Sequence, residues 1–105
     1  MPEIRQTTDR QTVITTFETS PGNCEDLLDA LREAYAGFIS KQPGFVAAAL
    51  HVNDAQTRIA NYSQWRHRED FLKMLRSEEM RAHNKRFNTL CRSFEPVLYE
   101  VAATF

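Results

Sequence analysis

Along this chain the hydrophobic residues switch between the two-residue spacing of a β-strand and the spacing of an amphipathic helix, and the order of these switches limits the fold more than any other feature. The short polar loop 53–56 joins two strand-like segments as a hairpin. The predicted order is therefore strand, helix, strand, strand, helix, strand. Strand spacing occurs in residues 11–19, 45–52, 57–65 and 97–105, and helical spacing in residues 23–38 and 71–94.

Capping residues mark the ends of the predicted helices. Asn23 is a good N-cap for the first helix, with Glu25 and Asp26 in the first turn, where the helix dipole favours acidic side chains. Ser77 is expected to cap a second segment within the later helical region. Pro96 is expected to end that region, so the last strand should begin after it.

This order predicts a ferredoxin-like α+β fold, an antiparallel sheet with both helices on one face. The other sheet face then needs a cover, and the predicted elements leave nothing over to provide it. We therefore expect a homodimer in which the two sheets pack together. The 105 residues are expected to form a single domain, with residues 1–10 as a loose N-terminal leader.

The charge balance argues against nucleic acid or an anionic membrane as a partner. Lysine plus arginine number 13 against 14 aspartate plus glutamate, a formal net charge of −1, so the chain produces no strong positive field. The N-terminus lacks the apolar stretch of a signal peptide, and no apolar run approaches the roughly 20 residues that span a bilayer. We expect a cytoplasmic protein whose partner is a small molecule or another protein.

The two cysteines give no indication of a metal site. Cys24 and Cys91 lie far apart in the sequence and belong to no CxxC or Cys/His pattern. Isolated cysteines of this kind are typical of reduced, structural thiols. We assign neither of them a role in the function.

The third predicted strand, "RIANYSQW", carries polar groups on the face that should be buried. The two-residue period places Ile59, Asn61, Ser63 and Trp65 on one side. Because Trp65 sits where the strand leads into a helix, we expect this side to face the helices and to form the floor of a pocket. A buried amide without a partner costs about 1–3 kcal/mol, so Asn61 should be bonded either to backbone or to a ligand.

These residues also resemble a known family. The run "NYSQW", followed by the acidic-aromatic helix start "EDF", is similar to the antibiotic biosynthesis monooxygenase family, whose members are dimeric α+β barrels. Several members oxidise phenolic, polycyclic or quinol compounds without metal or flavin. The match rests on Asn61 and Trp65, on His51 ten residues before the asparagine, and on Arg81 in "EMR". At Phe71 the chain departs from those enzymes, which carry a tyrosine there.

The resemblance implies a monooxygenase that needs no cofactor and uses O₂ to oxidise an aromatic phenol, hydroquinone or anthrone-type compound to a quinone. Asn61 and Trp65 would donate hydrogen bonds to the reduced oxygen, and His51 would act as the base. Arg81 would stabilise an oxyanion of the substrate. The remaining substrate-binding candidates are Phe71, His83, Ser63 and Ile59.

Three of these assignments have a structural alternative. An even number of residues in the hairpin loop would place His51 beside Arg58, on the face opposite Asn61, whereas an odd number or a bulge would reverse this. Arg81 could be an ordinary solvated helix residue. His83 could sit at the edge of the core.

Two other functions remain open for the same fold. Related small proteins degrade haem with a strand-one asparagine and a helix-two histidine. This chain instead has Thr15 or Thr16 on strand one and Met74, Leu75 and Arg76 about ten residues after the tryptophan, with His83 the nearest substitute. The other alternative is a small-molecule-binding dimer that is non-catalytic or acts as an isomerase or lyase, because one fold hosts unrelated functions.

Overall fold

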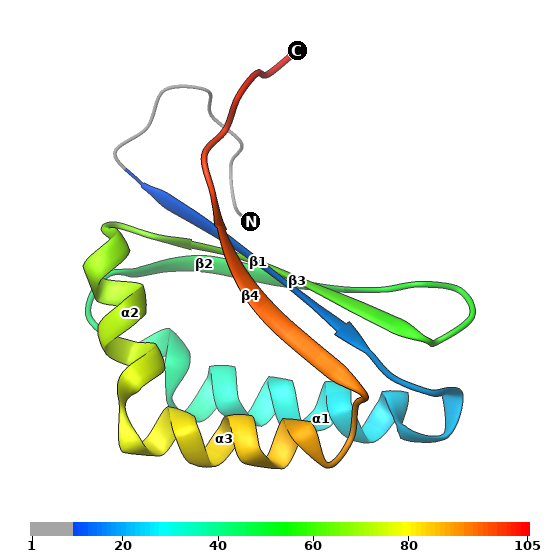
Figure 1. Cartoon of the computed structure of the whole chain (residues 1–105). Helices are drawn as coiled ribbons and strands as arrows, with labels where there is room; N and C mark the ends of the chain where they lie inside the picture. The colour runs from blue at the N-terminus through cyan, green and yellow to red at the C-terminus, as the bar shows by residue number, and fades with distance from the viewer. Residues whose placement is uncertain (1–9) are drawn as a thin grey trace.

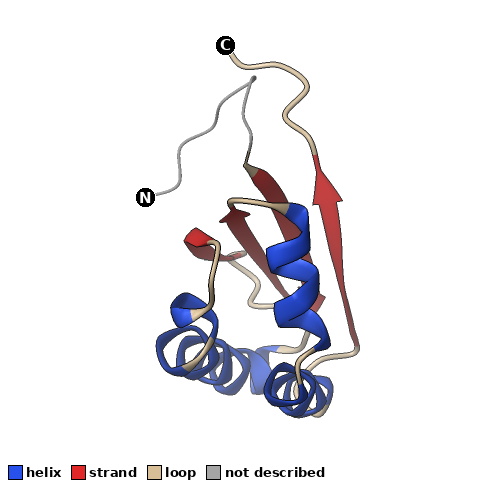
Figure 2. Cartoon of the chain, turned by 90° about the vertical axis from the view of Figure 1, so that its left-hand side faces the viewer, coloured by secondary structure: helices blue, strands red, loops and turns tan. Residues whose placement is uncertain are grey.

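The computed structural model describes residues 10–105, which form one antiparallel sheet with every helix on the same face (Figures 1 and 2). The predicted leader, residues 1–10, lies outside the described residues except for Arg10. The elements, in chain order, are β1 (Gln11–Glu18), α1 (Pro21–Gly37), the 3₁₀ turn η1 (Ile39–Lys41), β2 (Phe45–Val52), β3 (Arg58–Trp65), α2 (Arg68–Arg76), α3 (Glu78–Asn88) and β4 (Ser93–Tyr99).

The sheet has the order β2-β3-β1-β4, and each neighbouring pair is antiparallel. This arrangement confirms the predicted ferredoxin-like α+β fold. The two central strands pair so that Thr15 of β1 lies opposite Asn61 of β3, and Thr15 also lies opposite Pro96 of β4. Residues directly opposite one another in a sheet point to the same side, so these three share the helix-covered face.

The helices cover that face in one layer, with α1 and α3 side by side along the sheet and α2 at one end (Figure 1). Ser77 separates α2 from α3 as predicted, because its Oγ accepts a 3.2 Å hydrogen bond from the backbone N–H of Met80. An ion pair of 2.6 Å joins Arg86 of α3 to Glu33 of α1. The core between these layers includes Val13, Phe17, Leu27, Leu31, Ile59, Trp65 and Phe87.

The predicted start of the first helix is wrong by three residues. The helix begins at Pro21, and its N-cap is Ser20 rather than Asn23. Proline suits the first helical position because its fixed φ matches the helix and its missing N–H would have no partner there. The carbonyl of Ser20 accepts hydrogen bonds from the backbone of Asn23 and Cys24, at 3.0 and 2.9 Å.

The predicted boundary between the last helix and the last strand is also wrong. Helix α3 ends at Asn88, and β4 begins at Ser93, so the apolar residues Leu90, Cys91 and Phe94 follow the helix rather than extend it. Pro96 lies inside β4 and not before it. An edge strand tolerates proline because the missing N–H can fall on the side that has no neighbouring strand.

Strand β2 occupies the residues predicted for it and contains a bulge between Phe45 and Ala47. The extra residue brings Phe45 opposite Trp65, and their rings pack edge to face with centroids 5.4 Å apart. The loop after β2, residues 53–57, returns the chain to β3. The bulge therefore holds the ring of Phe45 against the ring of Trp65 at the end of β3.

Two further observations concern the chain as a whole. Cys24 and Cys91 are free thiols, and burial raises the pKa of both, which makes them poor nucleophiles at neutral pH. Among residues 10–105, none of the helices has the length and apolar character needed to cross a lipid bilayer.

Candidate active site

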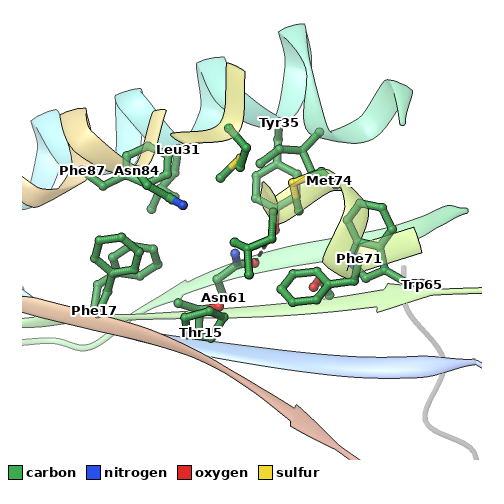
Figure 3. Close-up of a pocket in the computed structure, with 16 residues that line it drawn as sticks. Thr15, Phe17, Leu31, Tyr35, Asn61, Trp65, Phe71, Met74, Asn84 and Phe87 are labelled. Carbon is green, nitrogen blue, oxygen red and sulfur yellow. Dashed lines mark hydrogen bonds between the residues drawn. The ribbon is translucent and has the colours of Figure 1, made fainter. Parts of the chain in front are cut away.

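A cavity of about 40 Å³ lies between the sheet and the helices (Figure 3). Its walls come from β1, α1, β3, α2, α3 and β4, so all the main layers of the fold contribute. A water molecule needs about 10–15 Å³ of such space, so the cavity holds about three waters. The half-buried lining residues are Tyr35 of α1, Leu75 of α2, Asn84 of α3, and Phe94 and Pro96 of β4, and the others are buried.

Among residues 10–105, the lining is mostly apolar and contains no aspartate, glutamate, lysine, arginine or histidine. The polar side chains in it are Thr15, Tyr35, Asn61, Ser63 and Asn84, together with the indole N–H of Trp65. Such a site can offer fixed hydrogen-bond donors in an apolar surrounding. None of these lining side chains would act as a base at neutral pH.

Asn61 is held by a tyrosine from the opposite wall. The hydroxyl of Tyr35, on α1, donates a 2.8 Å hydrogen bond to Oδ1 of Asn61. Figure 3 shows this bond and shows the Asn61 nitrogen turned away from Tyr35, into the cavity. Burial raises the pKa of Tyr35 to about 12, although hydrogen bonds with Asn61 and Ser63 lower it in part.

Trp65 closes one end of the cavity and is 1% exposed. Its ring packs edge to face against Phe45 and Phe71, with centroids 5.4 and 5.8 Å away. The indole Nε1 is buried and has no hydrogen-bond partner among the described residues. An unpaired buried donor costs about 1–3 kcal/mol, so an acceptor that came within reach of this N–H would be stabilised.

The other end of the cavity is aromatic. Phe17 stacks on Phe94 with centroids 4.9 Å apart, and Phe87 meets Phe17 edge to face at 6.0 Å. Asn84 lies near this end, and Figure 3 shows its carboxamide pointing into the cavity. A flat apolar ligand could therefore pack against phenylalanine at one end and meet hydrogen-bond donors along the walls.

The sequence profile described as "Antibiotic biosynthesis monooxygenase" matches residues 10–86, from β1 into α3. The chain belongs to this family. As a member of the antibiotic biosynthesis monooxygenase family it is also similar to solved structures across almost its full length. No curated protein matches the chain in sequence.

Two of the similar structures are of SnoaB, a cofactor-independent oxygenase from Streptomyces nogalater. One is 23% identical, with a TM-score of 0.76, and the other, a variant, is 20% identical, with a TM-score of 0.81. Both comparisons cover 92% of this chain and 97% of SnoaB. A third is protein SO0527 from Shewanella oneidensis, 18% identical, with a TM-score of 0.75 over 92% of this chain and 93% of that one. At these identities the likeness shows the fold.

The structure brings together four of the residues that the sequence suggested for the site of this monooxygenase-family chain. Asn61, Ser63, Trp65 and Phe71 all line the cavity, and all four are buried. The first three come from β3 at two-residue spacing, and Phe71 comes from the first turns of α2. Their catalytic and binding roles remain predictions.

Two predicted site residues from the hairpin do not reach the cavity. His51 lies opposite Ala60 in the β2-β3 register, on the sheet face away from the helices, and it is exposed. Val52 pairs with Ile59, so six residues, an even number, lie between the last paired positions, and His51 falls on the side opposite Asn61. Ile59 does face the helices, but it is fully buried in the core beside Phe17 and does not line the cavity.

Two predicted residues on α3 also lie outside the cavity. Arg81 is exposed, because the cavity side of this helix is set by Met80, Asn84 and Phe87, at helical spacing. His83 is half-buried between aromatic rings, 5.9 Å from Phe38 and 6.4 Å from Phe87 between centroids. The structural alternatives for Arg81 and His83 therefore hold.

Tyr35 and Asn84 are polar lining residues that the sequence does not indicate as part of a site. Tyr35 continues the apolar stripe of α1, and this spacing alone indicates a position in the core. Asn84 lies four residues after Met80 and three before Phe87, so the helical spacing alone could have placed it on the cavity side. The bond from Tyr35 to Asn61 joins residues 26 positions apart and had no local signal.

Within the described residues, no group of three or more His, Cys, Asp or Glu side chains is arranged to hold a metal ion. Of the residues considered for haem degradation, Thr15, Met74 and Leu75 line the cavity. None of the lining residues is a histidine.

Proposed function

We propose that this protein is a cofactor-independent monooxygenase that oxidises an aromatic phenol, hydroquinone or anthrone-type compound to a quinone with O₂. The observation that carries the proposal is the pair of N–H donors in an apolar cavity: Nε1 of Trp65, which has no partner among the described residues, and the nitrogen of Asn61. Membership of the monooxygenase family and the fold shared with SnoaB, described as a cofactor-independent oxygenase, support the same reaction class.

Such a substrate supplies the electrons itself. A phenolate or anthrone anion passes one electron to O₂, and the resulting radical and superoxide combine to form a peroxide at the ring carbon. For a phenol or an anthrone, loss of water from the peroxide leaves the second carbonyl of the quinone, whereas for a hydroquinone it adds a third oxygen and gives a hydroxyquinone. One oxygen atom enters the product and the other leaves as water, so the balance needs no other reductant.

The lining residues would act by stabilising negative charge as it moves from the substrate to oxygen. The N–H groups of Asn61 and Trp65 are donors that keep their charge state throughout the reaction. The absence of carboxylates from the lining spares the anion from repulsion. Because the lining also lacks a base, the substrate must be acidic enough to lose its proton to water, and the rate should rise with pH through the pKa of the substrate.

The size of the cavity constrains how the substrate enters. At about 40 Å³ the cavity admits O₂ or a few waters but not a multi-ring compound. A polycyclic substrate must therefore widen it, and the half-buried lining residues, which include Leu75, Asn84 and Pro96, are the ones that solvent already reaches. Small mono-ring phenols require less opening and are the better first probes.

Oxygen uptake tests the proposal directly. The wild-type protein, treated with EDTA, is incubated with a panel of phenols, hydroquinones and anthrones under ¹⁸O₂. We expect uptake and a product carrying one ¹⁸O atom. In an Asn61→Ala/Trp65→Phe double variant the rate should fall by about 100-fold or more, because removing one fixed donor to an oxyanion typically costs 10²–10³ in rate.

The matched control is Asn88→Ala, which removes an exposed amide at the end of α3. Its rate should equal that of the wild type. Uptake that persists in the double variant would contradict the proposed role of the two donors. Ligand binding without any product across the panel would instead favour the small-molecule-binding alternative.

We also infer that the protein forms a homodimer through the sheet face that carries no helix. Figure 2 shows the helices on one side of the sheet only. On the other side Val97 and Tyr99 of β4 are 38% and 47% exposed. Apolar groups on an uncovered sheet face are typical of an interface.

Light scattering tests the dimer. The expected mass is twice that of the 12.2 kDa chain, and it should fall toward that of one chain in a Val97→Glu/Tyr99→Glu variant, which would bury two carboxylates. A wild-type mass of one chain at micromolar concentration would exclude the dimer.

A further inference from the structure

The proposed reaction leaves the phenol of Tyr35 without a role. Tyr35 is the one tyrosine among the residues that line the cavity, and it reaches in from α1, the wall opposite β3. Its hydroxyl donates to Oδ1 of Asn61 at 2.8 Å. With a pKa of about 12, the phenol keeps its proton at neutral pH and remains a donor.

The orientation of the Asn61 amide decides what the cavity offers to an anion. A carboxamide can turn by 180° at little steric cost, because its oxygen and nitrogen have nearly the same size. One orientation presents N–H donors to the cavity, and the other presents an oxygen lone pair. The first stabilises a superoxide or peroxide anion, and the second repels it.

Tyr35 selects the first orientation. Because the phenol proton needs an acceptor, Oδ1 of Asn61 points toward α1, and the nitrogen points into the cavity (Figure 3). In the reversed orientation the phenol would have to accept from the Asn61 nitrogen, and its own proton would lose this acceptor.

Tyr35 and Asn61 therefore form a hydrogen-bonded pair that joins α1 to β3. In a low-dielectric interior a bond donated to the amide oxygen polarises the amide, which makes its N–H groups stronger donors. The pair ends at the cavity, where Asn61 is 8% exposed.

We propose that Tyr35 is a positioning residue that holds the Asn61 amide with its N–H groups directed at the oxygen-derived anion. The inference rests on the proposed oxygenase function for its consequence, but the positioning itself can be measured without turnover. Tyr35 acts through Asn61 and need not touch the reacting atoms.

A double-mutant cycle tests the kinetic consequence. In the wild-type background, Tyr35→Phe keeps the ring and should lower kcat about 10-fold while KM changes less than about 2-fold, because the lost interaction matters only once charge develops. In the Asn61→Ala background, Tyr35→Phe should change kcat by less than about 2-fold.

The matched control is Tyr62→Phe, which removes a phenol hydroxyl from β3 on the opposite sheet face and should leave kcat unchanged. A loss of about 10-fold from Tyr35→Phe in both backgrounds would show that Tyr35 acts independently of Asn61 and would overturn the proposal. No loss in the wild-type background would overturn it as well.

A measurement without substrate separates this inference from the function. The side-chain amide signals of Asn61 in a ¹⁵N spectrum are identified by their disappearance in Asn61→Ala. In Tyr35→Phe we expect these protons to exchange with water about 10-fold faster than in the wild type, since the amide is no longer held. Equal exchange rates would overturn the proposal. Faster exchange in a protein that consumes no oxygen would keep the positioning and reject the oxygenase.

Discussion

The two ends of the cavity are built from different interactions. At one end Phe17, Phe87 and Phe94 pack ring against ring, with centroids 4.9–6.2 Å apart. The other end also contains packed rings, with Trp65 against Phe45 and Phe71, but it carries the indole N–H, and in the middle Tyr35 is bonded to Asn61. Ring packing tolerates small shifts and mainly stabilises the fold, whereas directed donors are sensitive to orientation. Damage to the first should therefore lower stability, and damage to the second should lower activity.

The largest effect is expected at the aromatic end. Phe87 is 1% exposed and contacts both Phe17 and Phe94, so Phe87→Ala should lower the free energy of unfolding by about 3–5 kcal/mol. Urea unfolding followed by circular dichroism measures this change. Phe105→Ala, at a fully exposed aromatic, is the control and should cost far less. A loss below about 1 kcal/mol for Phe87→Ala would remove the assigned stabilising role of this end.

The next effect concerns the pH dependence of stability at the hydrogen-bonded end. A phenol whose pKa is about 12 in the folded state and about 10 in the unfolded state favours folding fully below pH 10, and this contribution is lost as the pH rises toward 12. The free energy of unfolding of the wild type, minus that of Tyr35→Phe, should be about 1–2 kcal/mol lower at pH 11 than at pH 8. Urea unfolding of both proteins at the two pH values measures the difference. A constant difference would contradict the raised pKa.

A smaller effect is expected at Asn84, the polar group near the aromatic end. Asn84→Ala removes a carboxamide that points into the cavity, and we expect KM for a phenolic substrate to rise about 10-fold with stability nearly unchanged. Steady-state kinetics measure KM. Lys85→Ala, at the exposed neighbouring position, should leave KM as in the wild type. Equal KM values for the two variants would exclude contact between Asn84 and the substrate.

The smallest effect is expected outside both ends, at the ion pair of Arg86 and Glu33. The pair joins α3 to α1 at 2.6 Å, but both side chains are more than half exposed. Exposed pairs contribute about 0–1 kcal/mol, so Arg86→Ala should shift the urea midpoint only slightly, and less in high salt. A loss above about 2 kcal/mol would contradict the small contribution assigned to this exposed pair.

The residues predicted correctly for the cavity come mainly from β3, and the reason is geometric. A strand alternates sides every residue, so one anchor, Trp65 at the strand end, was enough to place Asn61 and Ser63. On α3 the same reasoning also requires that the rotation of the helix about its axis be known to within a fraction of a turn. Arg81 directly follows Met80, a lining residue, but it lies on the exposed side of the helix.

Features that depend on contacts between distant segments could not be predicted from the sequence. The side of the sheet occupied by His51 depended on the hairpin register, which the sequence left open between two outcomes. The bond from Tyr35 to Asn61 depends on how α1 packs over β3. Pro96 inside β4 was misplaced because proline usually marks a boundary, whereas an edge strand accepts it.

Trp65 is the only tryptophan of the chain, and its ring is buried where the cavity ends. Its fluorescence therefore reports on this one place, without a background from other indoles. Because the emission of an indole depends on the polarity around it and on what its N–H bonds to, water or a ligand entering the cavity should change the colour and intensity of the signal. The protein thus carries a built-in optical probe of its own binding site, in which ligands can be titrated without a label.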